Sequence, residues 1–492
     1  MSLYVLLASL LIIAAIVSTG VAQRAGVPAL VLFVGIGVAA GSAGVPFTNY
    51  ELGVNIGMLA LAVILLSGGL DMEAALFRAS LVPAGLLATA GVLLKTGVMG
   101  LIAWWLTPLD LLGGLLLGAI LAPTDAAAVF SVLKGCGLPK RLQGVLETES
   151  GTNDPISIYL TILLASALTT GTASVGTMAG GVVLQLAVGA VLGYGMGRGL
   201  VLLINQVRID SPGLYPVLAL AGGLLTYAAT DLVGGNGFLA IYVVGVVLGN
   251  APLVHRHNIQ NFMDGVAWGA QISMFLLLGL LVVPADLIPH IPAALLLTVG
   301  LVLVARPVSV VLTLAPLRLV GERFRFSLRE QALLSWAGLK GAVPIILAMV
   351  PLVNELPGST FIFNVTFVCV VVGTALQGLT IVPVGRWLGL ATTAPPPPPL
   401  RIELAGAAPP GSAVLDVLLE AEAPAVGERL AEIAIPPHMI VAALVRDGTL
   451  IAPRGHIRFQ PGDHVYVLTE NADGERPPDA FVAPPETPEV ST

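Results

Sequence analysis

The chain has 492 residues, of which 56% are hydrophobic and only 10% are charged, with a formal net charge of -7. Because a soluble domain carries about 25% charged residues, this composition excludes an ordinary soluble protein and predicts a polytopic membrane protein. The basic residues are scattered, which argues against a nucleic-acid surface. Cys136 and Cys369 lie far apart in apolar surroundings, so neither a disulfide framework nor a thiolate metal site is supported.

Apolar runs along the chain predict a bundle of membrane helices. The first run, from Leu3 to Val17, has no basic segment ahead of it, which favours a membrane helix over a cleaved signal peptide. Runs of spanning length predict about thirteen transmembrane helices in an all-α membrane domain. Their approximate ranges are 3–21, 27–43, 53–70, 80–105, 111–133, 139–168, 178–204, 213–231, 236–251, 264–283, 291–315, 328–353 and 359–388.

The charges between these helices support the predicted count. Lys and Arg accumulate on the cytoplasmic side of short loops. All twelve of the basic residues assigned to loops, from Arg24 to Arg329, follow odd-numbered helices, and none follows an even-numbered one. The amino terminus is therefore predicted to lie outside the cytoplasm and the carboxyl terminus inside it.

The composition changes after Arg386. Residues 1–390 are predicted to form the membrane domain, and 391–401 a proline-rich linker in extended polyproline conformation. Residues 402–470 read as a small α+β domain: "SAVLDVLLE" alternates like a strand, "VGERLAEIAI" has a helical period, and "MIVAALVRDGTLIAPRG" reads as two strands around a turn at Asp447 and Gly448. The tail, 471–492, is rich in Pro, Glu and Ala and is predicted to be disordered.

Two predicted helices are interrupted by polar residues. The fifth contains "ILAPTDAAAVF", where Pro123 removes a backbone donor and Thr124 and Asp125 follow at mid-depth. Simple capping of a half-helix would not require the charge of an aspartate. The twelfth contains "SWAGLKGAVPIILAMVP", where glycines and a proline surround Lys340. Interrupted helices of opposite direction, seven helices apart, predict inverted repeats whose crossed breaks enclose an ion site.

The sixth predicted helix carries the polar stretch "ESGTNDPISIYL". Helical spacing places Ser150, Asn153 and Asp154 on one face, and Glu149 on the adjoining face, where a structural ion pair would equally explain it. An all-oxygen cage suited to a hard monovalent cation would form from Ser150, Asn153 and Asp154 together with Asp125 and Thr124. Two carboxylates removed from water also bind a proton, so cation and proton would compete for one site, as exchange requires.

At these residues the sequence resembles the monovalent cation:proton antiporters of the NhaP and sodium/proton-exchanger type. Five motifs occur in family order over about 390 residues: "APTDAAAVF", "ESGTNDPIS", "ARPVSV", "GLKGAVPIILA" and "GTALQGLTIVP". The resemblance implies that Asp154 binds the cation or proton, with Asn153, Asp125, Thr124 and Ser150 as companions. It also implies alternating access, a dimerising scaffold and, from Asn beside Asp, electroneutral one-for-one exchange of K+ or Na+ for H+.

Three basic residues within the predicted helices bear on that mechanism. Lys340 stands where the family usually has an arginine that pairs with the glutamate matching Glu149, and because a buried lysine is able to lose its proton, the stoichiometry is in question. Arg306 matches a family arginine and is expected to be structural. Lys95 has no family role, and is expected to pair with a carboxylate of the bundle or to extend to a membrane surface.

The soluble domain resembles the RCK carboxyl-terminal (TrkA-C) module of potassium transport systems over residues 426–470. No glycine fingerprint of a nucleotide-binding fold precedes it. Relatives of this module pair up and bind small ligands, cyclic di-AMP being the best candidate, so the resemblance implies a regulated homodimer. No other cofactor is expected, and the setting is a bacterial cytoplasmic membrane.

Two other classes of protein are alternatives to the antiporter. An intramembrane aspartyl protease would also set two aspartates on neighbouring helices, but it typically shows a Gly-x-Gly-Asp stretch, which neither Asp125 nor Asp154 has. A ligand-gated potassium channel would explain the TrkA-C module, but it requires a carbonyl filter of the TVGYG kind, to which "VVGTALQG" is a poor match. A transporter, not an enzyme, is therefore expected.

Overall fold

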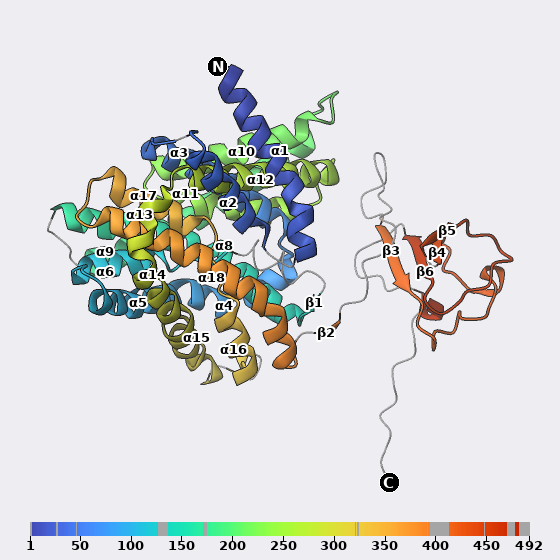
Figure 1. Ribbon diagram of the computed structural model, residues 1–492. Helices are drawn as coiled ribbons and strands as arrows, with labels where there is room; N and C mark the ends of the chain where they lie inside the picture. The colour runs from blue at the N-terminus through green and yellow to red at the C-terminus, as the bar shows by residue number, and fades with distance from the viewer. Residues whose placement is uncertain are drawn as a thin grey trace, which may run out of the picture. The chain divides into compact units, whose positions relative to one another are not determined.

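The computed structural model describes residues 2–25, 28–45, 47–125, 136–170, 175–319, 321, 324–390, 392–393, 413–446, 448–469 and 478–481. The chain divides into two compact units, Met1–Ala394 and Pro395–Thr492. The first unit is built almost entirely of helices, and the second contains a small sheet (Figure 1).

Each of the thirteen predicted ranges overlaps at least one described helix of the first unit. In the amino-terminal part these are α1 (Ser2–Ala25), α2 (Ala29–Ser42), α3 (Tyr50–Asp71), α4 (Ala74–Leu86), α5 (Val92–Leu106), α6 (Leu111–Ile120), α8 (Lys140–Thr170), α9 (Val175–Gln206) and α10 (Leu214–Leu232). They are followed by α11 (Gly237–Gly249), α12 (Arg256–Leu280), α13 (Pro284–Leu287), α14 (Ile291–Gly300), α15 (Arg306–Leu314), α16 (Leu328–Trp336), α17 (Val343–Val353) and α18 (Ser359–Trp387).

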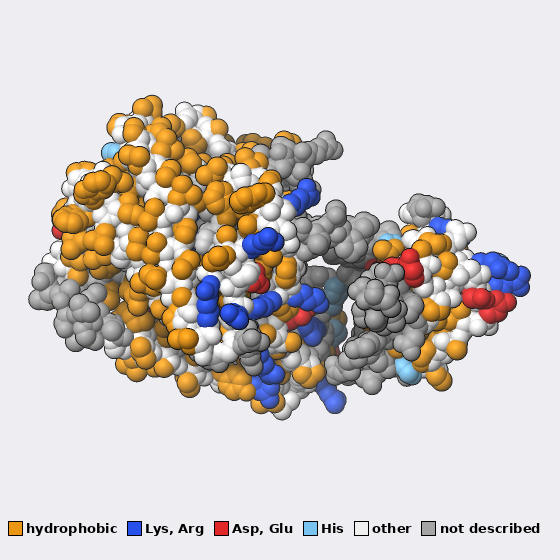
Figure 2. Space-filling model, turned by 90° about the horizontal axis from the view of Figure 1, so that it is seen from below, with side chains coloured by type: hydrophobic (Ala, Val, Ile, Leu, Met, Phe, Trp, Pro, Cys, Tyr) orange, Lys and Arg blue, Asp and Glu red, His pale blue; other side chains and the backbone are white. Residues whose placement is uncertain are grey.

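The surface of this unit suits a lipid environment. In the part of the chain that the structure describes, seven helical stretches are long and apolar enough to cross a membrane, and four shorter helices are apolar. Large apolar side chains on these helices are widely exposed, as Val191 of α9 is at 71%. Viewed from below Figure 1, the unit is broadly apolar, and Lys and Arg side chains gather on one part of that face (Figure 2). The predicted multi-span helical membrane domain is therefore confirmed.

Both predicted breaks are present, and they meet. Helix α6 ends at Ile120 and the chain continues without helical structure to Asp125, while α16 and α17 are separated by residues 337–342. The backbone N–H of Asp125 donates to the carbonyl of Leu339 over 2.9 Å, which joins the two interruptions directly. The backbone groups freed by each break thus lie side by side inside the unit.

Two further helices contain π-helical turns, at Leu87–Gly91 between α4 and α5 and at Leu301–Ala305 between α14 and α15. They are the fourth and eleventh predicted helices, seven apart like the interrupted pair. The hydroxyl of Ser309 donates to the carbonyl of Gly91 over 2.8 Å and ties them together. Such π-helical turns recur at functional sites, and Lys95 and Arg306 follow these two turns in the chain.

Helix α11 is held tightly against α3. A Cβ atom on Gly69 of α3 would lie 2.4 Å from the carbonyl oxygen of Tyr242 on α11, so the two backbones touch at this point. Small residues permit such close approach between membrane helices. The contact fixes the position of Tyr242, whose ring lies against α8.

The second unit is a four-stranded antiparallel sheet with strand order β3-β6-β4-β5. Its strands are β3 (Ala413–Leu418), β4 (Met439–Arg446), β5 (Thr449–Ile451) and β6 (His464–Thr469). Gly448 adopts a positive φ of 76° in the connection between β4 and β5, and the predicted pair of strands is confirmed. Strands β1 (Cys136–Gly137) and β2 (Thr392–Thr393), which were not predicted, pair within the first unit.

The helix predicted for "VGERLAEIAI" is wrong. That segment contains only a single 3-10 turn, Leu430–Glu432, and forms isolated bridges between Val426 and Phe459 and between Arg429 and Arg458. Gly427, with a positive φ of 89°, starts the segment in a conformation that a helix does not contain. The apolar side chains of this segment follow a helical spacing, but the backbone that carries them into the core of the domain is a coil.

Part of the predicted tail is also ordered. Residues 478–481 include a 3-10 turn, and the ring of Phe481 is buried at 1% exposure against Phe459, with 5.4 Å between ring centroids. The N–H of Ala425 donates to the carbonyl of Ala480 over 2.8 Å. The expectation of disorder from residue 471 onward is therefore wrong for these four residues, because a single large aromatic completes the core of the domain.

Candidate functional site

The polar stretch of α8 lies deep inside the membrane unit. Glu149, Ser150, Asn153 and Asp154 are all buried, and they lie near the middle of the helix. Pro155 follows within the helix and has no N–H to donate to the carbonyl of Gly151, four residues earlier. The stretch therefore presents both side-chain oxygens and a carbonyl oxygen without its helical partner.

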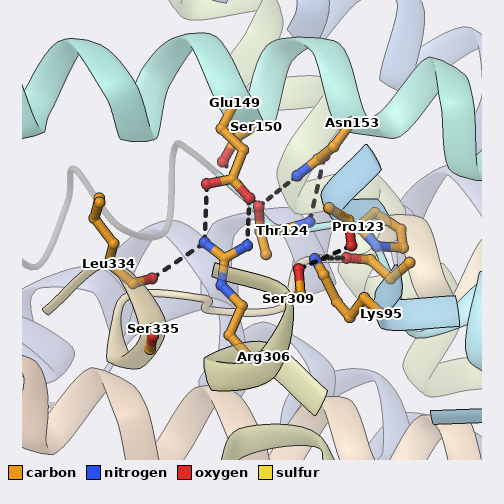
Figure 3. Close-up of polar contacts among 12 residues, drawn as sticks. Lys95, Pro123, Thr124, Glu149, Ser150, Asn153, Arg306, Ser309, Leu334 and Ser335 are labelled. Atoms are coloured by element: carbon orange, nitrogen blue, oxygen red, sulfur yellow. Dashed lines mark hydrogen bonds and ion pairs between the residues drawn. The ribbon is translucent and has the colours of Figure 1, made fainter. Parts of the chain in front are cut away.

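Three of the predicted site residues form one hydrogen-bonded group across the break after α6 (Figure 3). The amide nitrogen of Asn153 donates to Oγ1 of Thr124 over 2.6 Å, and the backbone N–H of Thr124 donates to Oδ1 of Asn153 over 3.4 Å. Oγ1 of Thr124 and Oγ of Ser150 lie 3.1 Å apart. The structure thus places these three side chains together. Two of them, Ser150 and Asn153, lie on the same face of α8, as their spacing predicts.

The two aspartates lie at the edge of this group. Asp154 is 7% exposed, and its Oδ1 is buried without a hydrogen-bond partner in the part of the chain that the structure describes. Asp125 is close enough to act on Asp154 electrostatically. A Cβ atom on Gly341 would lie 2.3 Å from Oδ2 of Asp125, so the absence of a side chain there makes room for the carboxylate. A buried carboxylate oxygen without a partner is costly unless a cation or proton binds it.

Two lysines donate to backbone carbonyls just after the end of α6, where the chain offers these carbonyls no helical partners. Lys340 donates to the carbonyls of Leu121 and Pro123 over 2.7 and 2.8 Å, and it lies 3.5 Å from that of Ala122. Lys95 donates to the same carbonyl of Ala122. Both lysines are buried, at 0% and 3% exposure for Lys95 and Lys340.

The expectation for Lys95 is therefore wrong. Its ammonium neither forms an ion pair with a described carboxylate nor reaches a surface, but donates to a backbone carbonyl at the helix break. The sequence marked Lys95 as unusual, yet only the packing of α5 against α6 shows what the side chain contacts.

Glu149 pairs with Arg306, not with Lys340 as the family pattern implies. The two side chains form a bidentate ion pair, with 2.9 Å between Nη2 of Arg306 and Oε2 of Glu149. Nη2 also donates to the carbonyl of Leu334 at the end of α16 over 3.1 Å (Figure 3). This pair, together with the bond to Leu334, joins α8, α15 and α16.

Residues of α18 that sequence reasoning did not single out hold the second break in place. Oγ1 of Thr374 donates to the carbonyl of Lys340 over 2.6 Å, and Nε2 of Gln377 donates to the carbonyl of Trp336 over 3.0 Å. Both residues belong to the motif "GTALQGLTIVP". The sequence signal for this contact with the second break is a polar pair three residues apart in an otherwise apolar helix.

Comparisons with known proteins identify the families to which the two parts of the chain are similar. Residues 10–387 match the model of the transmembrane sodium/hydrogen exchanger family, and residues 414–476 match the TrkA-C domain. The chain belongs to the sodium/hydrogen exchanger family. This exchanger is 40% identical to the K+/H+ antiporter NhaP2 of Shewanella sp. strain ANA-3, over 99% of its own length and 84% of the relative's. It is 38% identical to the K+/H+ antiporter NhaP of Alkalimonas amylolytica, over 96% and 82% of the two chains.

A solved structure supports the same fold for the exchanger. The sodium proton antiporter MjNhaP1 of Methanocaldococcus jannaschii matches it with a TM-score of 0.67 and 22% identity, covering 77% of this chain and 100% of that one. The relatives are transporters, so the protein is a membrane transporter and not an enzyme. The predicted family and the predicted carboxyl-terminal module are both confirmed.

The exchanger's site contains equal numbers of basic and acidic side chains among the described residues. Its described basic residues are Lys95, Arg306 and Lys340, and its described carboxylates are Asp125, Glu149 and Asp154. Arg306 is engaged by Glu149, and the two lysines donate to carbonyls of the α6 break. Among these groups, Oδ1 of Asp154 is a buried oxygen that has no hydrogen-bond partner among the described residues.

Proposed function

We propose that this protein is an antiporter that exchanges cytoplasmic K+ for external protons across a bacterial cytoplasmic membrane, with Na+ as the alternative cation. The observation that carries the proposal is the buried Oδ1 of Asp154, which has no hydrogen-bond partner among the described residues and lies beside two crossed helix breaks. The names of the most similar relatives favour K+ over Na+.

Asp154 is the group that binds either ion in this mechanism. A carboxylate buried beside Asp125 requires a positive partner, and a proton and a dehydrated cation satisfy that requirement in turn. Thr124, Ser150 and Asn153 supply neutral oxygens next to it, which is the ligand type that K+ and Na+ prefer. Because one carboxylate accommodates one ion at a time, cation and proton alternate.

The lysines set the charge carried per cycle. An ammonium group has three N–H donors, and Lys340 has three carbonyl oxygens within 3.5 Å. The Ala122 carbonyl also accepts from Lys95, so a neutral Lys340 amine, which has two N–H donors, would still satisfy the carbonyls of Leu121 and Pro123. Exchange is electroneutral, with one cation for one proton, as long as Lys340 keeps its charge through the cycle, and a rate that depends on membrane potential would show that it does not.

The TrkA-C domain lies in the cytoplasm and controls transport by binding a small ligand, with cyclic di-AMP as the first candidate. The exchanger works as a homodimer, joined through its membrane scaffold and its TrkA-C domains. The amino terminus lies on the outer side, as the distribution of Lys and Arg in the loops indicates.

The test is dissipation of a pH gradient in everted membrane vesicles. Adding K+ or Na+ to vesicles with the wild-type protein should collapse the gradient, and Asp154→Asn should abolish the effect while leaving protein abundance unchanged. The rate should not depend on membrane potential if exchange is electroneutral. If neither ion moves protons, whether the TrkA-C domain is present, removed or exposed to cyclic di-AMP, the antiporter assignment is overturned. Cation flux independent of the proton gradient would indicate a channel instead.

A further inference from the structure

A second carboxylate lies on the same stripe of α8 as Asp154. Glu147 precedes Asp154 by seven residues, which is two helical turns and about 10.5 Å along the axis, and Gly151 lies between them. Glu147 is half-buried. It lies between Asp154 and Lys140, which is the first residue of α8. A path from that end of the protein to Asp154 along α8 therefore passes Glu147 and Gly151.

Tyr242 of α11 covers the middle of this stripe. A Cβ atom on Gly151 would lie 2.5 Å from Cε2 and 2.9 Å from the hydroxyl oxygen of Tyr242, so the ring rests directly on the helix backbone. Tyr242 is 2% exposed, and its hydroxyl has no hydrogen-bond partner among the described residues. The hydroxyl is close enough to Glu147 for the two to interact electrostatically. A buried phenol usually finds a partner, so this one indicates a missing ligand.

The backbone supplies a third oxygen at the same place. Pro155 has no N–H for the carbonyl of Gly151, which therefore lacks its usual helical donor. Carbonyls freed by interrupted helices are ligands that transporters use for monovalent cations. Along the stripe, this carbonyl lies between Glu147 and Asp154.

The electrostatic surroundings favour a cation. Asp71 at the end of α3 and Glu73 beyond it both act on Glu147, and Asp264 of α12 acts on Asp71. Oγ of Ser67 donates to Oδ1 of Asp264 over 3.4 Å. Carboxylates gathered beside a membrane helix raise the local concentration of counter-ions.

We propose that Glu147, the Tyr242 hydroxyl and the Gly151 carbonyl form an outer subsite that binds the transported monovalent cation before it reaches Asp154. The proposal rests on the antiport function proposed above. Glu147 provides the charge, and the two neutral oxygens replace part of the hydration shell. The Tyr242 ring separates this subsite from Asp154, so that a cation passes from one to the other only when α11 and α8 shift relative to each other.

The subsite predicts an effect on apparent affinity that depends on the face from which K+ is supplied. In everted vesicles, where the cytoplasmic face is outward, Glu147→Gln should raise the KM for K+ roughly fivefold to tenfold, and Tyr242→Phe about threefold. Both should change the maximal rate less than they change KM. In right-side-out vesicles, with K+ supplied from the external face, KM should remain within about twofold of the wild-type value.

Asp210→Asn is the charge-matched control, because Asp210 is exposed in the connection between α9 and α10 and is not among the carboxylates that act on Glu147. It removes one negative charge from the same predicted side of the membrane and should change KM by less than about twofold. Glu147→Asp should restore most of the affinity that Glu147→Gln loses. An equal rise in KM from both faces, or an effect of Glu147→Gln no larger than that of Asp210→Asn, would overturn the proposal.

Binding without transport separates this proposal from the antiport function. Purified Asp154→Asn protein should still be stabilised against heat by K+ relative to choline, and the double variant Asp154→Asn/Glu147→Gln should lose that stabilisation. If Asp154→Asn already loses all K+ stabilisation, the subsite does not exist, whatever the vesicle assay shows. If the wild type binds K+ but moves no protons, the antiport function fails and the subsite remains.

Discussion

Lys95 and Lys340 reach the carbonyl oxygen of Ala122 from two distant parts of the chain. Lys95 comes from α5, and Lys340 comes from the break between α16 and α17. Both ammonium groups therefore lie at the carboxyl end of α6, where a positive charge is favoured by the helix dipole. The arrangement stabilises a broken helix inside the bundle with side chains from two distant parts of the chain.

The two lysines should differ in how much they contribute to folding. Lys340→Met removes the donor to Leu121 and Pro123, whereas Lys95→Met removes only the donor to Ala122. Each unsatisfied buried carbonyl costs about 1–3 kcal/mol, so Lys340→Met should lower the melting temperature of the purified protein further than Lys95→Met. Lys340→Arg keeps the donors and should preserve most of the stability. Equal losses for the two Met variants would contradict the proposed division of contacts.

The Glu149–Arg306 pair should be strongly coupled. Both side chains are buried, and removing one partner leaves an isolated charge, at a cost of about 3–5 kcal/mol. Glu149→Gln and Arg306→Met should each reduce folded protein severely, and the double variant should recover part of the loss. A double-mutant cycle on thermal stability measures the coupling, and additive losses would show that the pair does not act as a unit.

The room that Gly341 leaves for Asp125 should be essential. Gly341→Ala places a Cβ atom 2.3 Å from Oδ2 of Asp125, which requires the carboxylate to move. Antiport should fall at least about tenfold, because displacement by 1 Å in a site can cost that much. Gly97→Ala of α5 is the control, since nothing lies within 4 Å of the Cβ that it adds. Normal antiport by Gly341→Ala would show that the position of Asp125 is not critical.

Local geometry explains why part of the site was predictable. Ser150, Asn153 and Asp154 share a helical face, and Pro123 ends a helix wherever the chain places it. These are consequences of short-range backbone rules, and the contact between Asn153 and Thr124 follows once the sixth helix packs beside the break. Composition and apolar run length likewise predicted the helices, because the bilayer fixes their length.

The partners of the buried charges were not predictable in the same way. Glu149 and Arg306 are 157 residues apart, and the choice of Arg306 over Lys340 depends on how helices rotate in the packed bundle. The contact of Lys95 with Ala122 arises from the packing of α5 against α6. In the soluble unit, a helical spacing of apolar residues was misleading, because Gly427 and a pair of bridges dictate a coil.

The TrkA-C domain should depend on one buried ion pair. Asp463 is fully buried, accepts from Nε and Nη2 of Arg446 over 2.7 and 2.8 Å, and also accepts from the N–H of Gln460 over 2.8 Å. Asp463→Asn removes the charge that faces Arg446 and should cost about 3 kcal/mol, because an arginine on β4 loses its partner. Hydrogen exchange by mass spectrometry on the full-length protein should then show faster exchange across β4 and β6, with the membrane helices unchanged. Asp416→Asn is the control: Asp416 is exposed and lies 3.3 Å from His464, so exchange should change little. Equal acceleration by the two variants would mean that burial of Asp463 does not govern the stability of the sheet.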